Sequence, residues 1–281
     1  MARDFSLAHL TLLSCSPPEM VEIAARTGYS HVSLRPLPVS PNEPKYPMAD
    51  DKNMTALTKQ ALRDTGVKLL DIELARITAD ADMKSYVPAM EVAAELGGKM
   101  LLSSGWTPDK AFVTERFAEL CDLARPFGLF VGFEFVTFAS IGTLQDAADV
   151  VRGADRGNGG ICLDTLHWYR SNTKISELTS LPKSWFRFMQ LCDAPANAPT
   201  DRDGLIAIAR GGRLALGAGG LDVAAVVNAL PEMPYSLEIP NTRHAIEMSP
   251  IARAKHYLDT ANAYLDKHAS YENAPKASAR A

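Results

Sequence analysis

The sequence lacks several features that would place a chain of 281 residues in a specialised class. It has only four cysteines, Cys15, Cys121, Cys162 and Cys192, and none of their spacings matches a zinc or redox motif. No stretch approaches the ~18 consecutive apolar residues of a membrane span, and the N-terminus has no secretory signal pattern. We therefore expect reduced, structural cysteines, no membrane partner and, by default, a cytoplasmic location.

An excess of positive charge is also missing. Lys and Arg number 29 against 33 Asp and Glu, which gives a net charge of −4. Nucleic-acid binders usually carry clustered Lys and Arg, so no nucleic-acid partner is expected. The chain instead has 47% hydrophobic and 22% charged residues, a composition typical of a globular protein with a sizeable core.

Strand-like and helix-like patterns alternate along the whole chain. Strands are predicted near residues 5–12, 30–35, 67–74, 99–103, 129–136, 159–164, 186–191 and 235–239. A helical pattern follows each strand, and several of these patterns begin near a Pro and end at a Gly. Eight repeats predict one closed (β/α)₈ TIM barrel, a fold of ~250 residues.

The main alternative to the barrel is a doubly wound open sheet. No glycine-rich phosphate motif opens a helix after the first predicted strand, which disfavours the dinucleotide-binding version of that fold. We expect a single barrel domain over residues 1–268 and a flexible C-terminal tail over residues 269–281, which are mostly small or polar.

Two connections are unusually long for a compact domain. Residues 193–220 follow the seventh predicted strand, and residues 35–51, rich in Pro, follow the second. Long connections in compact domains are often functional lids, and barrel enzymes keep their sites at the carboxyl ends of the strands. Both segments are therefore expected to border a site.

Four polar residues occupy the same place in four similar hydrophobic segments. They are Glu134 in FVGFEFV, Asp164 in GGICLDTLH, Gln190 in FRFMQLCD and Glu238 in YSLEIP. Period-two alternation turns them away from their apolar neighbours, so closing the barrel brings them together. Buried carboxylates survive when they are paired or bind a metal, and an all-oxygen shell suits Mg²⁺ or Mn²⁺. The alternative is that each residue caps a strand end or pairs with a nearby cation.

Other residues are placed to contact a substrate. His167 follows Asp164 by three residues and is a candidate proton shuttle or substrate ligand, with a packed or surface histidine as the alternative. Arg213 precedes a glycine-rich turn in the long connection and suits a substrate oxygen or carboxylate, unless it is simply solvated. The second-rank candidates for substrate binding are Glu73, Arg35, His9 and Trp106, and the first two could instead pair with each other.

The order of these motifs resembles the xylose isomerase-like TIM barrel superfamily of the sugar phosphate isomerases and epimerases, which also includes endonuclease IV. The matching elements are Glu134, the Asp164 and His167 pair, Arg213 before Gly217 and Gly219, and Glu238. The resemblance spans residues 5–265. It departs at Gln190, where the pattern has a histidine, and this change either shifts the metal preference toward harder ions or removes the metal.

The resemblance implies a divalent-metal-dependent isomerase or epimerase. Its substrate would be a small keto-sugar or a related polyhydroxylated compound. Glu134 and Glu238 would bind the metal and move a proton next to a carbonyl through an enediolate, with His167 as the third catalytic residue. The alternatives are a metal-dependent lyase of the dehydroshikimate dehydratase kind, a non-catalytic binding barrel, and an endonuclease IV-like nuclease. A homo-oligomer is left open.

Overall fold

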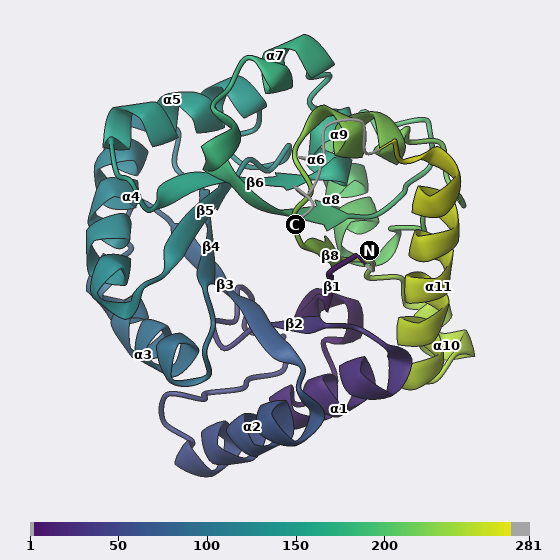
Figure 1. The fold of residues 1–281 in the computed structure, drawn as a ribbon. Coiled ribbons are helices and arrows are strands. Elements are labelled where there is room, and N and C mark those ends of the chain that lie inside the picture. Colours follow the sequence, from purple (N-terminus) through teal and green to yellow (C-terminus); the bar gives the residue numbers. More distant parts are fainter. Residues whose placement is uncertain (1–2, 271–281) are drawn as a thin grey trace, which may run out of the picture.

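The computed structural model describes residues 3–270, which form a closed barrel of eight parallel strands surrounded by helices (Figure 1). Each strand pairs with the next one along the chain, and β8 pairs with β1 to close the ring. The predicted TIM barrel is confirmed and the open sheet is wrong. The strands are β1 (Phe5–Leu7), β2 (His31–Leu34), β3 (Lys68–Ile77), β4 (Met100–Gly105), β5 (Phe130–Glu134), β6 (Gly159–Asp164), β7 (Phe186–Leu191) and β8 (Tyr235–Leu237).

One helix per repeat packs outside the strands, and all eight predicted helices are present. They are α1 (Pro17–Thr27), α2 (Lys52–Thr65), α3 (Val87–Glu95), α4 (Lys110–Ala124), α5 (Leu144–Ala154), α7 (Ile175–Thr179), α9 (Val223–Ala229) and α11 (Pro250–His268). Three further helices follow the carboxyl ends of the last strands: α6 (Thr165–Arg170), α8 (Arg202–Gly211) and α10 (Thr242–Glu247). They add structure on the side of the barrel where the strands end.

Helix α1 illustrates how the local sequence sets an element's bounds. Ser16 and Glu19 form a capping box at its start, and Pro17 occupies its first position. The helix ends at Gly28, whose φ of 99° lies in the left-handed region that a side chain disfavours. The Pro-first, Gly-last pattern read from the sequence is therefore the actual boundary chemistry.

Strand alternation separates the barrel core from its lumen. Phe133 points outward from β5, and its ring packs edge-on against Phe117 of α4 with 5.2 Å between the centroids. Its neighbour Glu134 therefore points inward, and the same parity holds for Asp164 beside Leu163. Most buried apolar side chains lie in one large cluster, while a separate small cluster consists of Leu70, Met100, Leu102, Cys162 and Phe188.

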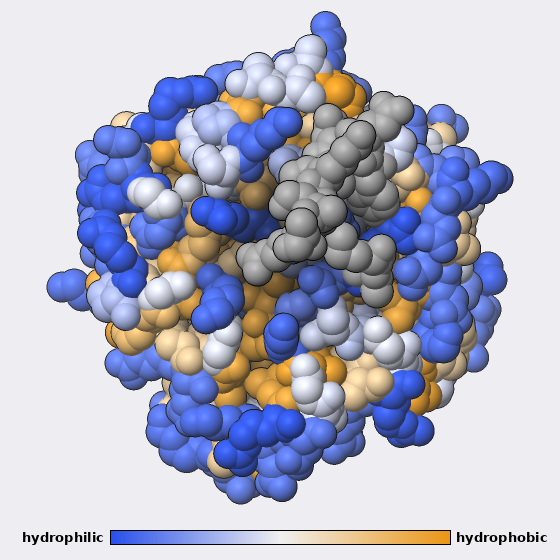
Figure 2. Space-filling model, in the orientation of Figure 1, coloured by the Kyte–Doolittle hydropathy of each residue, from blue (hydrophilic) through white to orange (hydrophobic). Residues whose placement is uncertain are grey.

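The periphery of the face seen in Figure 2 is largely hydrophilic. Figure 2 shows hydrophilic side chains over the outer helices, with apolar side chains recessed between them. Among residues 3–270 no helix combines the length and the hydropathy that a membrane crossing needs. The cytoplasmic location stays a prediction, and so does the domain boundary, because the predicted tail at 269–281 lies outside the described residues except for Ala269 and Ser270.

Candidate functional site

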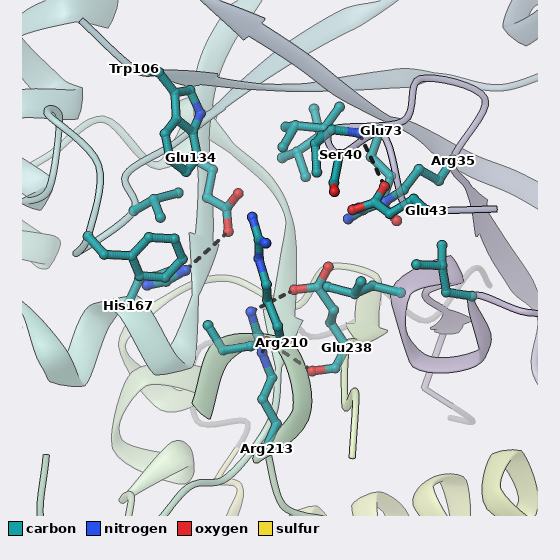
Figure 3. A pocket seen from close by; sticks show the side chains of 18 of the residues that line it. Arg35, Ser40, Glu43, Glu73, Trp106, Glu134, His167, Arg210, Arg213 and Glu238 are labelled. Atoms are coloured by element: carbon teal, nitrogen blue, oxygen red, sulfur yellow. Dashed lines mark hydrogen bonds and ion pairs between the residues drawn. The ribbon is translucent and has the colours of Figure 1, made fainter. Parts of the chain in front are cut away.

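A pocket of about 280 Å³ opens at the carboxyl ends of the strands (Figure 3). Both long connections contribute to its walls, as expected. Seven of the predicted site residues line it: Arg35, Glu73, Trp106, Glu134, His167, Arg213 and Glu238. Of the four residues predicted from strand alternation, Glu134 and Glu238 line this pocket, and Asp164 and Gln190 do not.

Glu134 ends β5 and points its carboxylate into this pocket (Figure 3). Its carboxylate makes no hydrogen bond with the described residues, and the His167 ring lies near it, with Nε2 3.9 Å from Oε1. Burial raises the pKa of Glu134 well above its usual value, and the charges of Asp164 and Glu238 add to the increase. This carboxyl is therefore ready to hold a proton or to bind a cation.

Arg213 joins two of the predicted metal ligands. Its Nη1 lies 2.5 Å from Oδ2 of Asp164, and its Nη2 lies 3.0 Å from Oε2 of Glu238. The carbonyl of Ala209, in the last turn of α8, accepts a hydrogen bond from Arg213 Nε at 2.9 Å. The guanidinium is thus fixed between the two carboxylates and is not a solvated loop side chain.

The two carboxylates bound by Arg213 respond differently to it. Burial by itself raises the pKa of Asp164, but Arg213, His167 and the bond from Leu166 N bring that pKa below its usual value. The pKa of Glu238 is raised to about 8, mainly by burial. Repulsion from Glu73 and Asp164 adds to this increase, and the attraction of Arg213 does not offset it. One guanidinium therefore does not neutralise the three carboxylates at positions 134, 164 and 238.

His167 lies in α6, and its contacts with Thr137 determine which ring nitrogen carries the proton. The Thr137 amide donates to Nδ1 at 3.4 Å, and its Oγ1 lies 3.1 Å from the same nitrogen. Because an amide can only donate, Nδ1 is the acceptor and Nε2 carries the ring proton. Burial lowers the pKa of His167 to about 4, so the ring is neutral near pH 7 and directs an N–H toward Glu134.

Arg35 and Glu73 pair with each other, as the sequence left open. Arg35 Nη2 lies 2.9 Å from Glu73 Oε2, and Arg35 Nη1 lies 3.5 Å from Oε1 of Glu43 in the connection after β2. Both residues of the first pair still line the pocket beside Trp106, whose Nε1 donates to Ser104 Oγ at 2.8 Å. A balanced ion pair therefore forms this wall of the pocket.

His9 is not among the residues that line the pocket, and its contact with a substrate stays a prediction. Its Nδ1 accepts a bond from the Arg35 amide at 2.8 Å, and its Nε2 lies 2.9 Å from the Cys15 carbonyl. The ring is fully buried and stacks on Tyr46 with 5.0 Å between the centroids. With both ring nitrogens bonded internally, His9 positions the backbone of Arg35.

Gln190 lies inside the barrel, level with Asp164 in the strand register. Its Oε1 accepts a weak bond from Cys162 Sγ at 3.5 Å, and it is not among the residues that line the pocket. Its role as a metal ligand stays a prediction.

Within residues 3–270, the only group of three or more His, Cys, Asp or Glu side chains close enough to share one ion is Glu134, Asp164 and His167. One ligand atom from each lies within 4.8 Å of the others, and all three are buried. His167 Nε2 carries a proton in this arrangement, so the donors of this group that fit a divalent cation are the oxygens of Glu134 and Asp164. Glu238 borders the same pocket and, like Asp164, is paired with Arg213.

Two residues that contribute to the site were not predicted from the sequence. Asp193, just past β7, accepts bonds from the amides of Ala194, Gly217, Gly219 and Leu221 at 2.7 to 3.1 Å. This buried carboxylate holds the long connection that carries Arg213. Arg210, at the end of α8, lines the pocket. An Asp directly after a predicted strand is a signal for the first, whereas nothing in the sequence marks the second.

Comparison with known proteins gives a family and several relatives. The family model described as xylose isomerase-like TIM barrel matches residues 21–268. An inosose isomerase of Bacillus velezensis is 22% identical over 246 residues, which are 80% of this chain and 82% of that protein. A 3-dehydroshikimate dehydratase of Pseudomonas aeruginosa is 30% identical over 138 residues, which are 47% of this chain but only 21% of that protein.

Solved structures with the same fold include an IOLI protein with a bound zinc atom and a D-allulose 3-epimerase of Methylomonas sp. in complex with D-allulose. The first has a TM-score of 0.80 at 18% identity and covers 95% of this chain and 99% of that chain. The second has a TM-score of 0.68 at 16% identity and covers 95% of this chain and 97% of that chain. At these identities the likeness establishes the fold.

Proposed function

Because the chain belongs to the xylose isomerase-like TIM barrel family, we propose that it is an isomerase or epimerase that moves a proton on the carbon next to a carbonyl group. The substrate class is a keto-sugar or a related polyhydroxylated compound. The observation that carries the proposal is the pair of buried carboxyls, Glu134 and Glu238, which face one pocket from β5 and from the end of β8. Relatives that are isomerases and epimerases favour the same reaction type.

The chemistry assigns a role to each side chain. A carboxyl with a raised pKa holds a proton near neutral pH, and its conjugate base removes one efficiently, so Glu134 and Glu238 suit proton removal and return. They border the pocket from different sides, which allows a proton to leave one face of a carbon and return to the other (Figure 3). Arg213 fixes the orientation of Glu238 through the 3.0 Å ion pair.

His167 serves as a hydrogen-bond donor to the substrate. Its protonated Nε2 faces the pocket. Its low pKa keeps the ring neutral while Glu134 gains or loses a proton. A neutral imidazole N–H can bind a carbonyl oxygen as negative charge develops there in an enediolate. Thr137 holds the tautomer that this role requires.

A divalent metal is the proposed cofactor, with Mn²⁺ or Mg²⁺ as the preferred ions because oxygen donors dominate the site. Glu134 and Asp164 would hold it, and Gln190 and Glu238 remain its other proposed ligands. When bound, such an ion would polarise the oxygens of the substrate and stabilise developing negative charge.

Proton exchange in D₂O tests this proposal directly. Metal-loaded protein is mixed with D-allulose, D-fructose and inosose, and deuterium at the carbon next to the carbonyl is followed by NMR. Glu134→Gln should abolish exchange, while Glu95→Gln, which changes an exposed carboxylate paired with Lys59, should leave it unchanged. Absence of exchange across a broad panel of ketoses, with the metal bound, would contradict the proposal.

A lyase or dehydratase is the second candidate. It is favoured by the similarity to the dehydratase of Pseudomonas aeruginosa, although that match covers only part of each protein. The same enediolate can expel a β-substituent, and the same carboxyls would move the proton. Mass spectrometry of the products separates the two reactions, because an epimer keeps the mass of its precursor and an elimination loses water or an alcohol.

A further inference from the structure

Three arginines line the pocket, Arg35, Arg210 and Arg213, and a fourth, Arg76, packs against its lining residue Trp106. Only two of these four are neutralised by carboxylates. Arg213 is paired with Asp164 and Glu238, and Arg35 is paired with Glu73 and Glu43. The charges of these two guanidinium groups are therefore balanced by carboxylates of the protein. The other two, Arg76 and Arg210, form no ion pair within residues 3–270, and we name them the rim arginine pair.

Arg210 is the more open member of the rim arginine pair. It lies in the last turn of α8 and is exposed, and Figure 3 shows its guanidinium pointing into the pocket. It makes no hydrogen bond or ion pair with the part of the chain that the structure describes. All its donors are thus available to a ligand that enters the pocket.

Arg76 comes from β3 and is fixed against two residues that line the pocket, Trp106 and Val39. Its guanidinium carbon lies 3.8 Å from the centroid of the Trp106 ring, and its Nη1 donates to the Val39 carbonyl at 3.1 Å. Its Nε is buried and has no hydrogen-bond partner. Because stacking and the bond to Val39 already fix this half-buried side chain, it loses little further entropy when an anion binds.

The two members of the pair influence each other's charge. Burial lowers the pKa of Arg76, and the like charge of Arg210 lowers it further. Tyr86 and Glu43 oppose this decrease, but Glu43 is already bonded to Arg35 and to the Val39 amide. Neither of these two cations has an ion-pair partner of its own, and an anion bound near both would relieve their repulsion.

We propose that the rim arginine pair binds an anionic group of the substrate, a carboxylate or a phosphate, while the polyhydroxylated carbonyl end lies deeper beside Glu134 and His167. The assignment to a substrate rests on the proposed function. It narrows the substrate class from neutral keto-sugars to sugar acids or sugar phosphates, because a neutral sugar leaves both guanidinium groups without a partner.

Calorimetric binding with matched probes tests this proposal. The probe pairs are D-glucuronate against D-glucose and D-fructose 6-phosphate against D-fructose, with inorganic phosphate as the simplest anion. The wild-type protein should bind at least one anionic member about tenfold more tightly than its neutral counterpart, as expected for a charge-assisted hydrogen bond. Preference for D-glucuronate identifies a carboxylate, and preference for the phosphate ester identifies a phosphate.

The variant Arg210→Ala should remove that preference, with a loss of about tenfold or more for the anionic probe and little change for the neutral one. Because Arg210 is exposed, this change should leave folding intact. Arg63→Ala is the matched control: it removes one exposed positive charge from the end of α2, away from the pocket, and should leave the preference unchanged.

Three outcomes would overturn the proposal: equal affinity for charged and neutral probes, no binding of any anionic probe, or an unchanged preference in Arg210→Ala. Isotope exchange is measured separately on the same proteins. Anion binding that depends on Arg210 but is not accompanied by proton exchange would contradict the proposed function and support the anion site. Proton exchange without a preference for charged probes would support the proposed function and contradict the anion site.

Discussion

The Nη1 atom of Arg213 lies 2.5 Å from Oδ2 of Asp164, and both side chains are almost completely buried, at 3% and 0% exposure. Residues 49 positions apart thus form an ion pair in the centre of the site. Charges withdrawn from water in this way depend on each other, because removing one leaves the other uncompensated. The pair therefore stabilises the fold as well as organising the pocket.

Replacing Arg213 by an uncharged residue should lower the stability of the protein. In Arg213→Met the stem of the side chain is retained, but Asp164 and Glu238 lose their partner, and we expect a loss of about 3–5 kcal/mol in the free energy of unfolding near pH 7. Urea unfolding measures this loss. Arg243→Met, which breaks an exposed i,i+4 pair with Glu247, should cost less than about 0.5 kcal/mol. A loss for Arg213→Met as small as that of this control would show that the buried pair is not needed.

The stability of the metal-free protein should fall as the pH rises. Glu238 has a pKa of about 8 in the folded protein against 4.5 for an ordinary glutamate, so the folded state binds its proton more tightly than the unfolded chain. This contribution is fully present below about pH 4.5 and is lost as the pH rises through about 8. Chemical unfolding between pH 5 and 9 should show the decline, and Glu238→Gln should flatten it. A curve of unchanged slope in that variant would contradict the assignment.

Divalent ions should reverse this loss. A cation competes with protons for Glu134 and its neighbours, so Mn²⁺ or Mg²⁺ should raise the melting temperature more at pH 8 than at pH 5.5. The variant Glu134→Gln should lose most of the shift, while Glu95→Gln on the surface should retain it. Thermal unfolding with added Mn²⁺, Mg²⁺ or Zn²⁺ provides the readout. If no ion shifts the melting temperature at pH 8, the metal proposal is wrong.

His167 should act as a neutral donor. With its pKa near 4, it does not titrate between pH 6 and 8, so the exchange rate should show no histidine step in that range. His167→Ala should lower kcat for proton exchange by about 10²-fold or more, and Thr137→Val, which weakens the control of the tautomer, should lower it less. A pH profile with an inflection near 6.5 that vanishes in His167→Ala would assign the ring a different role.

Much of the barrel, and which of its side chains face inward, could be predicted from the sequence. Period-two alternation in a closed barrel fixes which side chains face inward, so Glu134 and Asp164 were placed correctly without knowledge of any contact. The eight strands followed from the same alternation. Where the pattern was local, as in the Pro17 start and the Gly28 end of α1, the prediction matched the element closely.

The rest depends on contacts between distant segments. Arg213 pairs with Asp164 and Glu238 because of three-dimensional packing that no local pattern encodes. The same is true of His9, whose two ring nitrogens are both bonded inside the protein. Arg210 points into the pocket because α8 forms inside a connection expected to be a loop. A helix of 10 residues there has an amphipathic pattern, but its orientation depends on the bonds made by Asp193 and Ala209.

The connection after β7 should be sensitive to one added methyl group. A Cβ on Gly219 would lie 2.3 Å from the Ala194 carbonyl oxygen and 2.4 Å from Asp193 Oδ1, which is far inside van der Waals contact. The same Asp193 pairs its backbone with Leu214, next to Arg213, at 2.8 and 2.9 Å. Gly219→Ala should therefore move the segment that carries the guanidinium.

We expect Gly219→Ala to lower the free energy of unfolding by about 1–3 kcal/mol, as overpacking does, and to reduce kcat for proton exchange because Glu238 loses its fixed partner. Gly157→Ala is the control, because a Cβ there meets nothing within 4 Å. Urea unfolding and exchange kinetics on both variants separate the effects. If Gly219→Ala matches the control in stability and in kcat, the bonds of Asp193 do not position the arginine, and Arg213 must be held by its carboxylate partners and the Ala209 carbonyl alone.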